Sequence, residues 1–576
     1  MVELRRLLIA NRGEIAVRIV RACREAGISP VVAVAQGEQA SLAAEIADAT
    51  VDVTSYIDAE SIVRAATEAS ADAVHPGYGF LAEDPAFAER VLEAGLVWIG
   101  PPPEAMRALG DKVAARVVAE AAGVPVVPGS AGEGLRDDAL VEEAARLGLP
   151  LLVKAAAGGG GRGMRTVEDL ADLPNALAAA REEASASFGD ERVFLERRLG
   201  RVHHVEVQVL LDDHGDSVHL GERDCSLQRR HQKIVEESPS PAVDDATRET
   251  LGAAAVAIAE RAGYRGAGTA EFLLGDDHEW WFLEMNARLQ VEHPVTEAVT
   301  GIDLVRAQLA IAAGAPLPFQ QGDVALRGHA IEARVYAEDP ANGFLPTGGR
   351  VDLLELPHWP GVRVDTALRS GDLVGLGYDP LLAKVIAWAE DRPAAITRLR
   401  VALEDVKIVG LTTNLGFLLD VLESPVVRHG TADTDWVETG WTPQVPSLPD
   451  GVGAERDRSD PWFAFGASPA ATRGVTVAGA HAQFRGWSYE IADDDHVATD
   501  LAPPGGSLVA PMPASVLRVD VAVGDTVAPG QVVALLEAMK IQVQVVAPAA
   551  GAVSAVHVHI GDVVARGDVL IEVVEP

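Results

Sequence analysis

The sequence Leu-Leu-Glu-Ala-Met-Lys-Ile at residues 535–541 lies near the middle of an internal duplication. An Ala-Pro pair at 510–511 recurs at 547–548, and a Gly-Asp pair at 524–525 recurs at 561–562. The offset is the same in both cases, and a constant offset indicates a repeated structural unit. The C-terminal part of the chain therefore consists of two related halves that meet close to Lys540.

Each half alternates apolar residues with other residues, as at 519–523 and 556–560. This period of two predicts half-buried β-strands, with the Gly-Asp pairs in the turns between them. We expect two similar four-stranded units that stack as a flattened barrel, with Lys540 at the turn that joins them. A lysine at such a turn stands clear of the core, where another enzyme can modify it.

The tripeptide that ends in this lysine resembles a known family. Ala538-Met539-Lys540, framed by Pro-Met-Pro at 511–513 and by Gly567, is similar to the centre of a biotinyl carrier domain. The resemblance implies that Lys540 carries covalent biotin, attached by a biotin protein ligase. A lipoyl carrier has the same fold, but its lysine usually follows Asp, so the Ala-Met pair favours biotin. The duplication argues against the alternative, an ordinary surface lysine on a small β domain.

Length and composition limit what the rest of the chain can be. At 576 residues it is too long for one core, so three or four domains are expected. A net charge of −37 argues against nucleic acid and anionic membranes as partners, since both attract a basic surface. Two cysteines are too few for a disulfide framework, and no apolar run is long enough for a signal peptide or a membrane span. We expect a soluble protein of the cytoplasm.

Strand and helix signals alternate over the first 110 residues. Apolar strand-like runs at 7–10, 31–34 and 73–75 are separated by stretches of helical character such as 14–26. This βαβ rhythm predicts an open, mostly parallel, doubly wound sheet. The turn after the first run reads Asn-Arg-Gly and lacks the GxGxxG pattern, so dinucleotide binding is not predicted.

A glycine-rich loop follows the strand predicted at 151–154. Four consecutive glycines at 158–161 remove side chains, so that backbone N–H groups can approach phosphate oxygens closely. The loop lacks the Gly-Lys-Ser/Thr of a Walker A motif, and by itself it is a weak signal. A flexible linker is the alternative, which Lys154 at the end of the strand argues against.

Three polar clusters follow, at 222–233, around Glu271 and at 284–292. In the third cluster polar residues occupy every second position, namely Glu284, Asn286, Arg288, Gln290 and Glu292. On a β-strand that spacing would place all five on one face, where we expect them to line a cleft. A solvated strand face is the alternative, which the apolar residues at 280–283 argue against.

Residues 1 to about 440 resemble biotin carboxylase, an ATP-grasp enzyme. The resemblance rests on the clusters above and extends to the sequences at 327–334 and 344–346. It implies that bicarbonate is phosphorylated by ATP to carboxyphosphate, which breaks down to carbon dioxide and phosphate. The phosphate then deprotonates the ureido nitrogen of biotin, which is carboxylated.

The resemblance also implies roles for individual residues on the nucleotide side of the site. Divalent metal, Mg²⁺ or Mn²⁺, would be held by the hard oxygen ligands of Glu271, Glu284 and Asn286. The ATP phosphates would be contacted by Lys112 and Lys154, under a lid around Gly160 and Gly161. The adenine edge would be held by Glu196 and the backbone of Arg197 to Leu199, and the ribose and phosphate region by His204, Gln228 and His231.

On the bicarbonate side, the resemblance implies an anion pocket formed by Lys233, Arg288 and the backbone at Val291. Glu292 would act as the general base. Arg334 would contact biotin and stabilise the negative charge that develops on its ureido oxygen. A planar guanidinium can bind a carboxylate or phosphate at two points, which suits Arg288.

The fold class that follows is multidomain, α/β and α+β. An ATP-grasp carboxylase core with an N-terminal doubly wound sheet precedes a C-terminal flattened β-barrel carrier. The expected divisions are 1–110, 111–205, 206–441, a linker with a small β element at 442–505, and the carrier at 506–576. We expect residues 459–498 of the linker to bind a partner subunit.

The family resembled is the α subunit of biotin-dependent acyl-CoA carboxylases. The chain shows no carboxyltransferase domain, so a separate β subunit and a hetero-oligomer are expected. The acetyl- or propionyl-CoA type is the expectation, although the choice of acyl-CoA is made by the other subunit. Two alternatives stay open: an ATP-grasp ligase that joins a carboxylate to an amine, and a carrier scaffold with an inactive ATP-grasp core.

Overall fold

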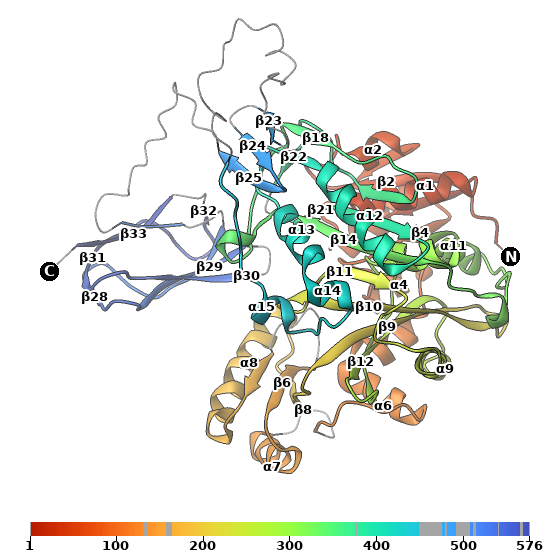
Figure 1. Ribbon diagram of the computed structural model, residues 1–576, viewed down its shortest axis with the longest axis horizontal. Coiled ribbons are helices and arrows are strands. Elements are labelled where there is room, and N and C mark those ends of the chain that lie inside the picture. Colours follow the sequence, from red (N-terminus) through yellow and green to blue (C-terminus); the bar gives the residue numbers. More distant parts are fainter. Residues whose placement is uncertain are drawn as a thin grey trace, which may run out of the picture.

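The computed structural model describes residues 2–130, 136–156, 164–375, 377–448, 475–478, 481–490, 507–510, 514–538, 541–564 and 568–574. Figure 1 shows two parts of very different size. The larger part holds the parallel sheet and a large antiparallel sheet, and the carrier region projects from it at the end opposite to the N-terminus. No helix within the described ranges combines the length and the apolar character that crossing a bilayer requires.

The N-terminal region is an open parallel sheet. Its strands are β1 (Arg6–Ile9), β2 (Ser29–Val34), β3 (Ala49–Asp52), β4 (Ala73–His75) and β5 (Val97–Trp98), in the order β3-β2-β1-β4-β5. The helices are α1 (Gly13–Glu25), α2 (Leu42–Ile46), α3 (Ala59–Glu68), α4 (Pro85–Glu93) and α5 (Pro103–Gly110). Leu7 and Ile9 pack in one buried cluster and Leu8 in another, so β1 is covered on both faces. The doubly wound sheet is thereby confirmed.

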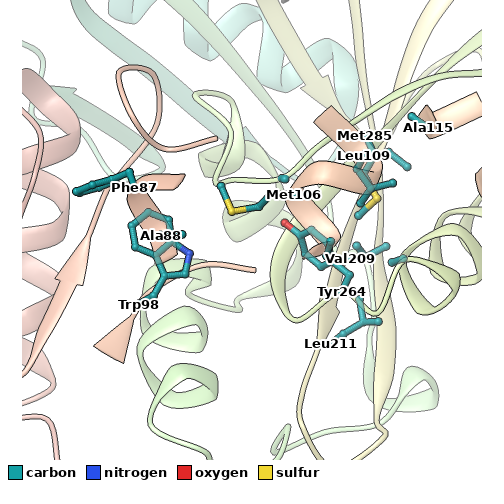
Figure 2. Packing of buried hydrophobic residues seen from close by; sticks show 14 of the residues in the cluster. Phe87, Ala88, Trp98, Met106, Leu109, Ala115, Val209, Leu211, Tyr264 and Met285 are labelled. Atoms are coloured by element: carbon teal, nitrogen blue, oxygen red, sulfur yellow. The ribbon is translucent and has the colours of Figure 1, made fainter. Parts of the chain in front are cut away.

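One apolar core joins this sheet to the large sheet. Figure 2 shows Phe87 and Trp98 beside each other, with ring centroids 5.4 Å apart. Met106 lies between this pair and Tyr264, and all four belong to one buried cluster. Because Met106 is part of α5, this helix contributes an apolar contact that connects the two sheets.

A smaller unit follows, drawn in orange in Figure 1. It contains β6 (Leu151–Ala155), β7 (Arg165–Val167) and β8 (Val193–Arg197) in the order β7-β6-β8, packed with α7 (Asp137–Leu147) and α8 (Leu173–Phe188). Helix α6 (Lys112–Ala121) precedes it. The strand predicted before the glycine-rich loop is β6.

The large antiparallel sheet carries the predicted site. Its order is β13-β12-β9-β10-β11-β14-β21-β19. The bounds are β9 (Val202–Leu211), β10 (Ser217–Arg229), β11 (Gln232–Ser238), β12 (Gly266–Gly275), β13 (Trp280–Asn286), β14 (His329–Tyr336), β19 (Val362–Thr366) and β21 (Leu381–Ala389). The helices that accompany it are α9 (Asp245–Arg261), α10 (His293–Thr300), α11 (Leu304–Ala312) and α12 (Arg392–Asp405).

Short elements complete this part of the chain. The strands are β15 (Glu338–Asp339), β16 (Leu345–Pro346), β17 (Gly349–Arg350), β18 (Leu353–Glu355), β20 (Leu373–Val374) and β22 (Lys407–Val409), and the helices are α13 (Leu415–Glu423), α14 (Pro425–His429) and α15 (Trp436–Gly440).

The small β element predicted inside the linker is present. It consists of β23 (Val475–Ala478), β24 (His481–Phe484) and β25 (Trp487–Glu490). The buried Gln483 side chain donates to the Val406 carbonyl and accepts from the Ile408 N–H, each at 2.9 Å. These strands therefore dock on the region around β22. The rest of the expected partner-binding segment, 459–498, lies outside the described residues.

The carrier region consists of two four-stranded antiparallel sheets, β26-β33-β31-β28 and β30-β29-β27-β32. Their bounds are β26 (Ser507–Val509), β27 (Ala514–Val519), β28 (Thr526–Val527), β29 (Val532–Ala538), β30 (Ile541–Val546), β31 (Gly551–Val556), β32 (Val563–Val564) and β33 (Val569–Val574). The offset of the duplication relates β27, β28 and β29 to β31, β32 and β33. Each sheet takes strands from both halves, so the halves interleave and share one apolar core.

The strands predicted at 519–523 and 556–560 are wrong in position. Strand β27 ends at Val519 and β31 ends at Val556, so the alternating stretches follow the strands. Val523 and Ile560 are 64% and 69% exposed. Val558 is buried and Val521 packs against the carrier core, so one side of each stretch faces inward without being part of a strand. Gly524 and Gly561 come next, with φ of +97° and +93°, and turn the chain.

Candidate active site

The polar face of the large sheet is organised around one ammonium group. Lys233 on β11 contacts Glu206 and places Nζ 2.8 Å from Glu271 and 2.7 Å from Glu292. Burial would lower the pKa of Lys233, but the three carboxylates outweigh it and raise that pKa well above its usual value. The ammonium is therefore charged throughout the physiological pH range.

Glu292 lies between this ammonium and a guanidinium. Arg334 on β14 donates from Nη2 to Glu292 at 3.0 Å and from Nε to Glu236. Burial would raise the pKa of Glu292, but Lys233, Arg334 and Arg223 hold it well below its usual range. Glu236 shows the opposite balance, because burial outweighs Arg334 and raises its pKa to about 7. The two carboxylates beside Arg334 thus differ in how readily they ionise.

A second guanidinium supports this network from the interior. Arg223 and Glu206 are fully buried and form an ion pair. Arg223 also donates to the side chains of Gln208 at 3.0 Å, Thr296 at 2.9 Å and Thr269 at 3.1 Å. Every residue in this set is held by hydrogen bonds that reach between strands or to α10, which fixes the carboxylates that face Lys233.

The polar row at 284–292 is only partly a strand. Strand β13 is an edge strand that ends at Asn286, whose partner on β12 is Thr269. Residues 287–292 form a loop that leads into α10, so the prediction of one continuous strand face is wrong. Strand β12 continues for three more residues, Gly266 to Gly268, but the chain after Asn286 leaves the ladder and does not pair with them. Five alternating polar residues nevertheless reach one site, because the loop folds back on itself.

Arg288 is held at the centre of this loop. Its guanidinium donates to Asn286 at 3.0 Å and to Gln290 at 2.9 Å, and its Nε lies 2.9 Å from Glu83. Glu83 also accepts from the Ala287 N–H at 2.9 Å. Glu83 comes from the loop before α4, so the N-terminal sheet region fixes the start of the loop at 287–292.

Two carboxylates face each other across β12 and β13. Glu271 and Glu284 are directly paired in the ladder, so they share a face of the sheet. Asn286 donates to Glu271 at 2.8 Å, and Lys112 lies 3.3 Å from Glu284. Carboxylate and amide oxygens on one face fit the ligand preference of Mg²⁺.

A different grouping of possible metal ligands occurs one strand further in. His204, Glu206 and Glu271 each bring a ligand atom within 4.8 Å of the others. Glu206 is already paired with both Arg223 and Lys233. Glu284 is partly exposed and has Lys112 at 3.3 Å, so Glu271, Glu284 and Asn286 stay the predicted ligand set.

The predicted nucleotide residues on the smaller unit also meet. Lys154 on β6 and Arg116 on α6 both contact Glu196 on β8, Arg116 at 2.8 Å. The Arg197 N–H donates to Pro128 at 2.8 Å, which ties β8 to the chain that precedes α7. Leu199 lies just beyond β8 and is partly exposed.

On the large sheet, His204 on β9 pairs with Glu271 at 3.0 Å. Gln228 near the end of β10 is buried, and His231 sits in the β10–β11 turn with φ of +63°. Burial and then Lys154 lower the pKa of His231, so its imidazole is neutral at pH 7. Gly160, Gly161 and Lys540 lie outside the described residues.

Four family descriptions match the chain in order. They are "Biotin carboxylase, N-terminal domain" at 3–106, "Carbamoyl-phosphate synthase L chain, ATP binding domain" at 111–320, "Biotin carboxylase C-terminal domain" at 332–439 and "Biotin-requiring enzyme" at 506–573. A biotin carboxylase of a Nostoc species is 45% identical over 439 residues, which cover 75% of this chain and 98% of that protein. The chain belongs to the biotin carboxylase family.

Related α subunits extend beyond the biotin carboxylase region. The α subunit of rat mitochondrial methylcrotonoyl-CoA carboxylase is 45% identical over 439 residues, 75% of this chain and 61% of that subunit. The propionyl-CoA carboxylase α chain of Ruegeria pomeroyi is 42% identical over 458 residues, 75% of this chain and 67% of that one. The matches thus span about three fifths to two thirds of these longer relatives.

Among solved structures, the biotin carboxylase domain of a 2-oxoglutarate carboxylase from Hydrogenobacter thermophilus superposes with a TM-score of 0.75 at 40% identity. The match covers 76% of this chain and 98% of that domain, which was solved in complex with MgADP, ADP and bicarbonate. The biotin carboxylase fold of the core is thereby confirmed, as is a biotinyl-type domain at the C-terminus.

Within this biotin carboxylase core, the structure brings together most of the residues predicted from the sequence. Lys233, Glu292 and Arg334 are linked by direct hydrogen bonds, and Arg288 is linked to Asn286. Lys154 and Glu196 form a second group on β6 and β8. Val291 takes part through its carbonyl, which accepts from Lys384.

Sequence reasoning missed five charged residues of this network, one of which is Glu236 beside Arg334. The other four are Glu83, Glu206, Arg223 and Lys384. Glu206 lies in the alternation His-Val-Glu-Val-Gln at 204–208, and Lys384 is the one charged residue in the apolar run at 381–389. Both are patterns that a search for lone charges in buried strands would have found.

Proposed function

We propose that this chain carboxylates biotin attached to Lys540, using ATP and bicarbonate, as the first half-reaction of an acyl-CoA carboxylase. The observation that carries the proposal is the linked set Lys233, Glu292 and Arg334 beside the loop that holds Arg288. Membership of the biotin carboxylase family and a biotinyl-type domain on the same chain support it. The carrier would be 506–576 and the carboxylase 1–441, with the linker between them.

The anion would be bound by Lys233, Arg288 and the backbone at Val291. Two cations and a backbone group around one position suit a small planar oxyanion. Glu292 stays ionised at neutral pH, so it can accept a proton whenever bicarbonate lies within hydrogen-bond reach. Its depressed pKa gives this transfer little driving force, which makes position the main contribution of Glu292. Arg334, held by Glu292 and Glu236, would present its charge to the ureido oxygen of biotin.

On the nucleotide side, Glu271, Glu284 and Asn286 would hold Mg²⁺ or Mn²⁺, which neutralises phosphate oxygens during phosphoryl transfer. Lys112 and Lys154 would neutralise the phosphates, with Gly160 and Gly161 in a lid above them. The adenine edge would be held by Glu196 and the backbone of Arg197 to Leu199. The ribose region would be held by His204 near the start of β9, Gln228 near the end of β10 and His231 in the turn that follows.

A separate carboxyltransferase β subunit would complete the reaction in a hetero-oligomer. The methylcrotonoyl-CoA and propionyl-CoA relatives support an acyl-CoA as the final acceptor. The propionyl-CoA relative, at 42% identity, supports propionyl-CoA within the predicted acetyl- or propionyl-CoA type, and the methylcrotonoyl-CoA relative, at 45%, supports methylcrotonoyl-CoA. Acyl-CoA-dependent consumption of the bound carboxyl group, measured after mixing with the co-purified β subunit, would separate these acceptors.

The proposal is tested by ATP-dependent transfer of labelled bicarbonate onto the full chain after treatment with biotin ligase. The wild type should take up label, and Lys540→Ala and Arg288→Ala should not. Free biotin should be carboxylated by Lys540→Ala and not by Arg288→Ala. The exposed Arg136 gives the matched control, since Arg136→Ala removes a guanidinium far from these contacts and should leave labelling unchanged.

The two alternatives give different results. A biotinylated wild type without label, and without ATP turnover, would leave a carrier beside an inactive ATP-grasp core. ATP turnover that depends on an amine acceptor and not on biotin would indicate a carboxylate–amine ligase. Either result would overturn the proposal.

A further inference from the structure

One lysine inside the large sheet donates a hydrogen bond to a backbone carbonyl of the loop at 287–292. Lys384 on β21 is fully buried, and its Nζ donates to the Val291 carbonyl at 2.8 Å. The same ammonium lies 3.1 Å from Glu14 on α1 and 3.8 Å from Asp365 on β19. A buried ammonium needs such partners, because removing it from water is costly.

The side chain of Lys384 stays positively charged at neutral pH. Burial would lower the pKa of Lys384, but Glu14, Glu332 and Asp365 outweigh it and raise that pKa above its usual value. A charged donor makes a stronger hydrogen bond to a carbonyl than a neutral one does. The bond from Lys384 to Val291 is therefore a strong constraint on the peptide plane that joins Val291 to Glu292.

The loop at 287–292 has no strand ladder to hold it, so its shape depends on contacts such as this one. Glu83 holds its beginning through the Ala287 N–H and Arg288. Lys384 holds its end, immediately before Glu292. The two contacts come from regions of the chain that lie about 300 residues apart, and both end on the loop that carries the anion-binding groups.

We propose that Lys384 is a positioning residue that fixes the Val291–Glu292 peptide plane and so sets the affinity of the site for bicarbonate. This inference rests on the proposed function, which assigns Val291 and Glu292 to the bicarbonate pocket. Lys384 does not touch bicarbonate itself. It acts through the loop, so its loss should weaken the binding of bicarbonate and leave the affinity for ATP unchanged.

The test measures bicarbonate-dependent ATP hydrolysis by the full chain with free biotin. Lys384→Met keeps the length of the side chain and removes its donor. We expect the KM for bicarbonate to rise at least tenfold, with the KM for ATP within twofold of the wild type. A purely structural role would lower the amount of active protein, and hence kcat, without this separation of the two KM values.

Glu14→Gln is the matched control, because it removes the ion pair and leaves Lys384 able to donate to Val291. Its KM for bicarbonate should equal that of the wild type. If Lys384→Met does not fold, the double variant Glu14→Gln/Lys384→Met avoids an unpaired buried carboxylate at this ion pair and is compared with Glu14→Gln alone. An equal rise in Glu14→Gln and Lys384→Met, or no rise in either, would refute the inference.

The two levels of proposal fail in different ways. Wild-type protein without bicarbonate-dependent ATP hydrolysis would refute the proposed function and this inference with it. Active wild type with an unchanged KM for bicarbonate in the Lys384 variants would refute the positioning role only.

Discussion

The large sheet and the carrier are both antiparallel β structures, but they bury different things. In the sheet Arg223, Glu206, Glu236, Glu332 and Lys384 are all fully buried. Within the described residues of 507–574 the buried side chains are all apolar. A carrier needs only a stable platform beneath one modified lysine, whereas a site for anionic substrates needs charges held in place away from water. The difference in interiors therefore follows the difference in task.

The largest expected effect is the loss of a buried charge from the sheet. Arg223→Met leaves Glu206 without its guanidinium and removes three further hydrogen bonds, so we expect about 3–5 kcal/mol of destabilisation. All nine tryptophans lie before residue 506, seven of them in the carboxylase part and two in the linker, so tryptophan fluorescence during urea unfolding does not report on the carrier.

Biotin ligase labelling of Lys540 reports on the carrier in the same variant and should stay at the wild-type level. Arg136→Met, on an exposed side chain, is the control for the fluorescence shift. A stability of Arg223→Met equal to that of this control would show that the buried charges are not what holds the sheet.

The reverse experiment removes an apolar side chain from the carrier. Leu536 is fully buried on β29, and Leu536→Ala should destabilise the carrier by about 2–5 kcal/mol through lost burial and the cavity left behind. Biotin ligase labelling should fall, because the lysine loses its folded platform, while carboxylation of free biotin should persist.

Val523→Ala provides the control for the carrier, since Val523 is 64% exposed and its truncation should cost less than about 0.5 kcal/mol. If Leu536→Ala also abolished carboxylation of free biotin, the two parts would not be independent and the comparison would fail.

The two regions also differ in how far the sequence predicts them. The carrier sequence is a local repeat, and its strands recur along the chain at the offset of the duplication. The alternation at 519–523 was misleading because period two indicates a half-buried strand only where a partner strand is present. Likewise the row from Glu284 to Glu292 predicts the right residues with the wrong backbone, since the ladder stops at Asn286.

The core site was predictable where a motif names its residues and unpredictable where the fold supplies a partner. Lys233 and Arg288 stand in such motifs. Glu83 and Lys384 are single residues about 300 positions apart in the chain, and only the packing of the N-terminal sheet region and β21 around the loop brings them together. Contacts of this kind depend on tertiary structure, and a single sequence carries no trace of them beyond a lone charge in an apolar strand.

The smallest effect concerns pH, and it follows from the same difference in interiors. His75 on β4 is fully buried, and burial lowers its pKa to about 3. The unfolded chain binds a proton at this residue below about pH 6.5, and the folded chain does not until near pH 3. The stability of the carboxylase part should therefore fall as pH drops through this window, by about 1.4 kcal/mol per pH unit from His75 alone.

His75→Asn isolates this contribution, because an asparagine oxygen can replace Nδ1 as acceptor for the Gly77 N–H and does not titrate. The packing cost of the substitution is the same at every pH. The pH-dependent contributions of other groups are the same in the two proteins and cancel in the difference; they include Glu236, whose raised pKa acts in the opposite direction. Urea unfolding followed by tryptophan fluorescence at pH 7 and pH 5 should show the gap between wild type and variant narrowing by about 2 kcal/mol. If the free energy of unfolding fell equally in the two proteins between pH 7 and pH 5, His75 would take up its proton in the folded state as readily as in the unfolded chain. This buried group would then not make the carboxylase part sensitive to acid.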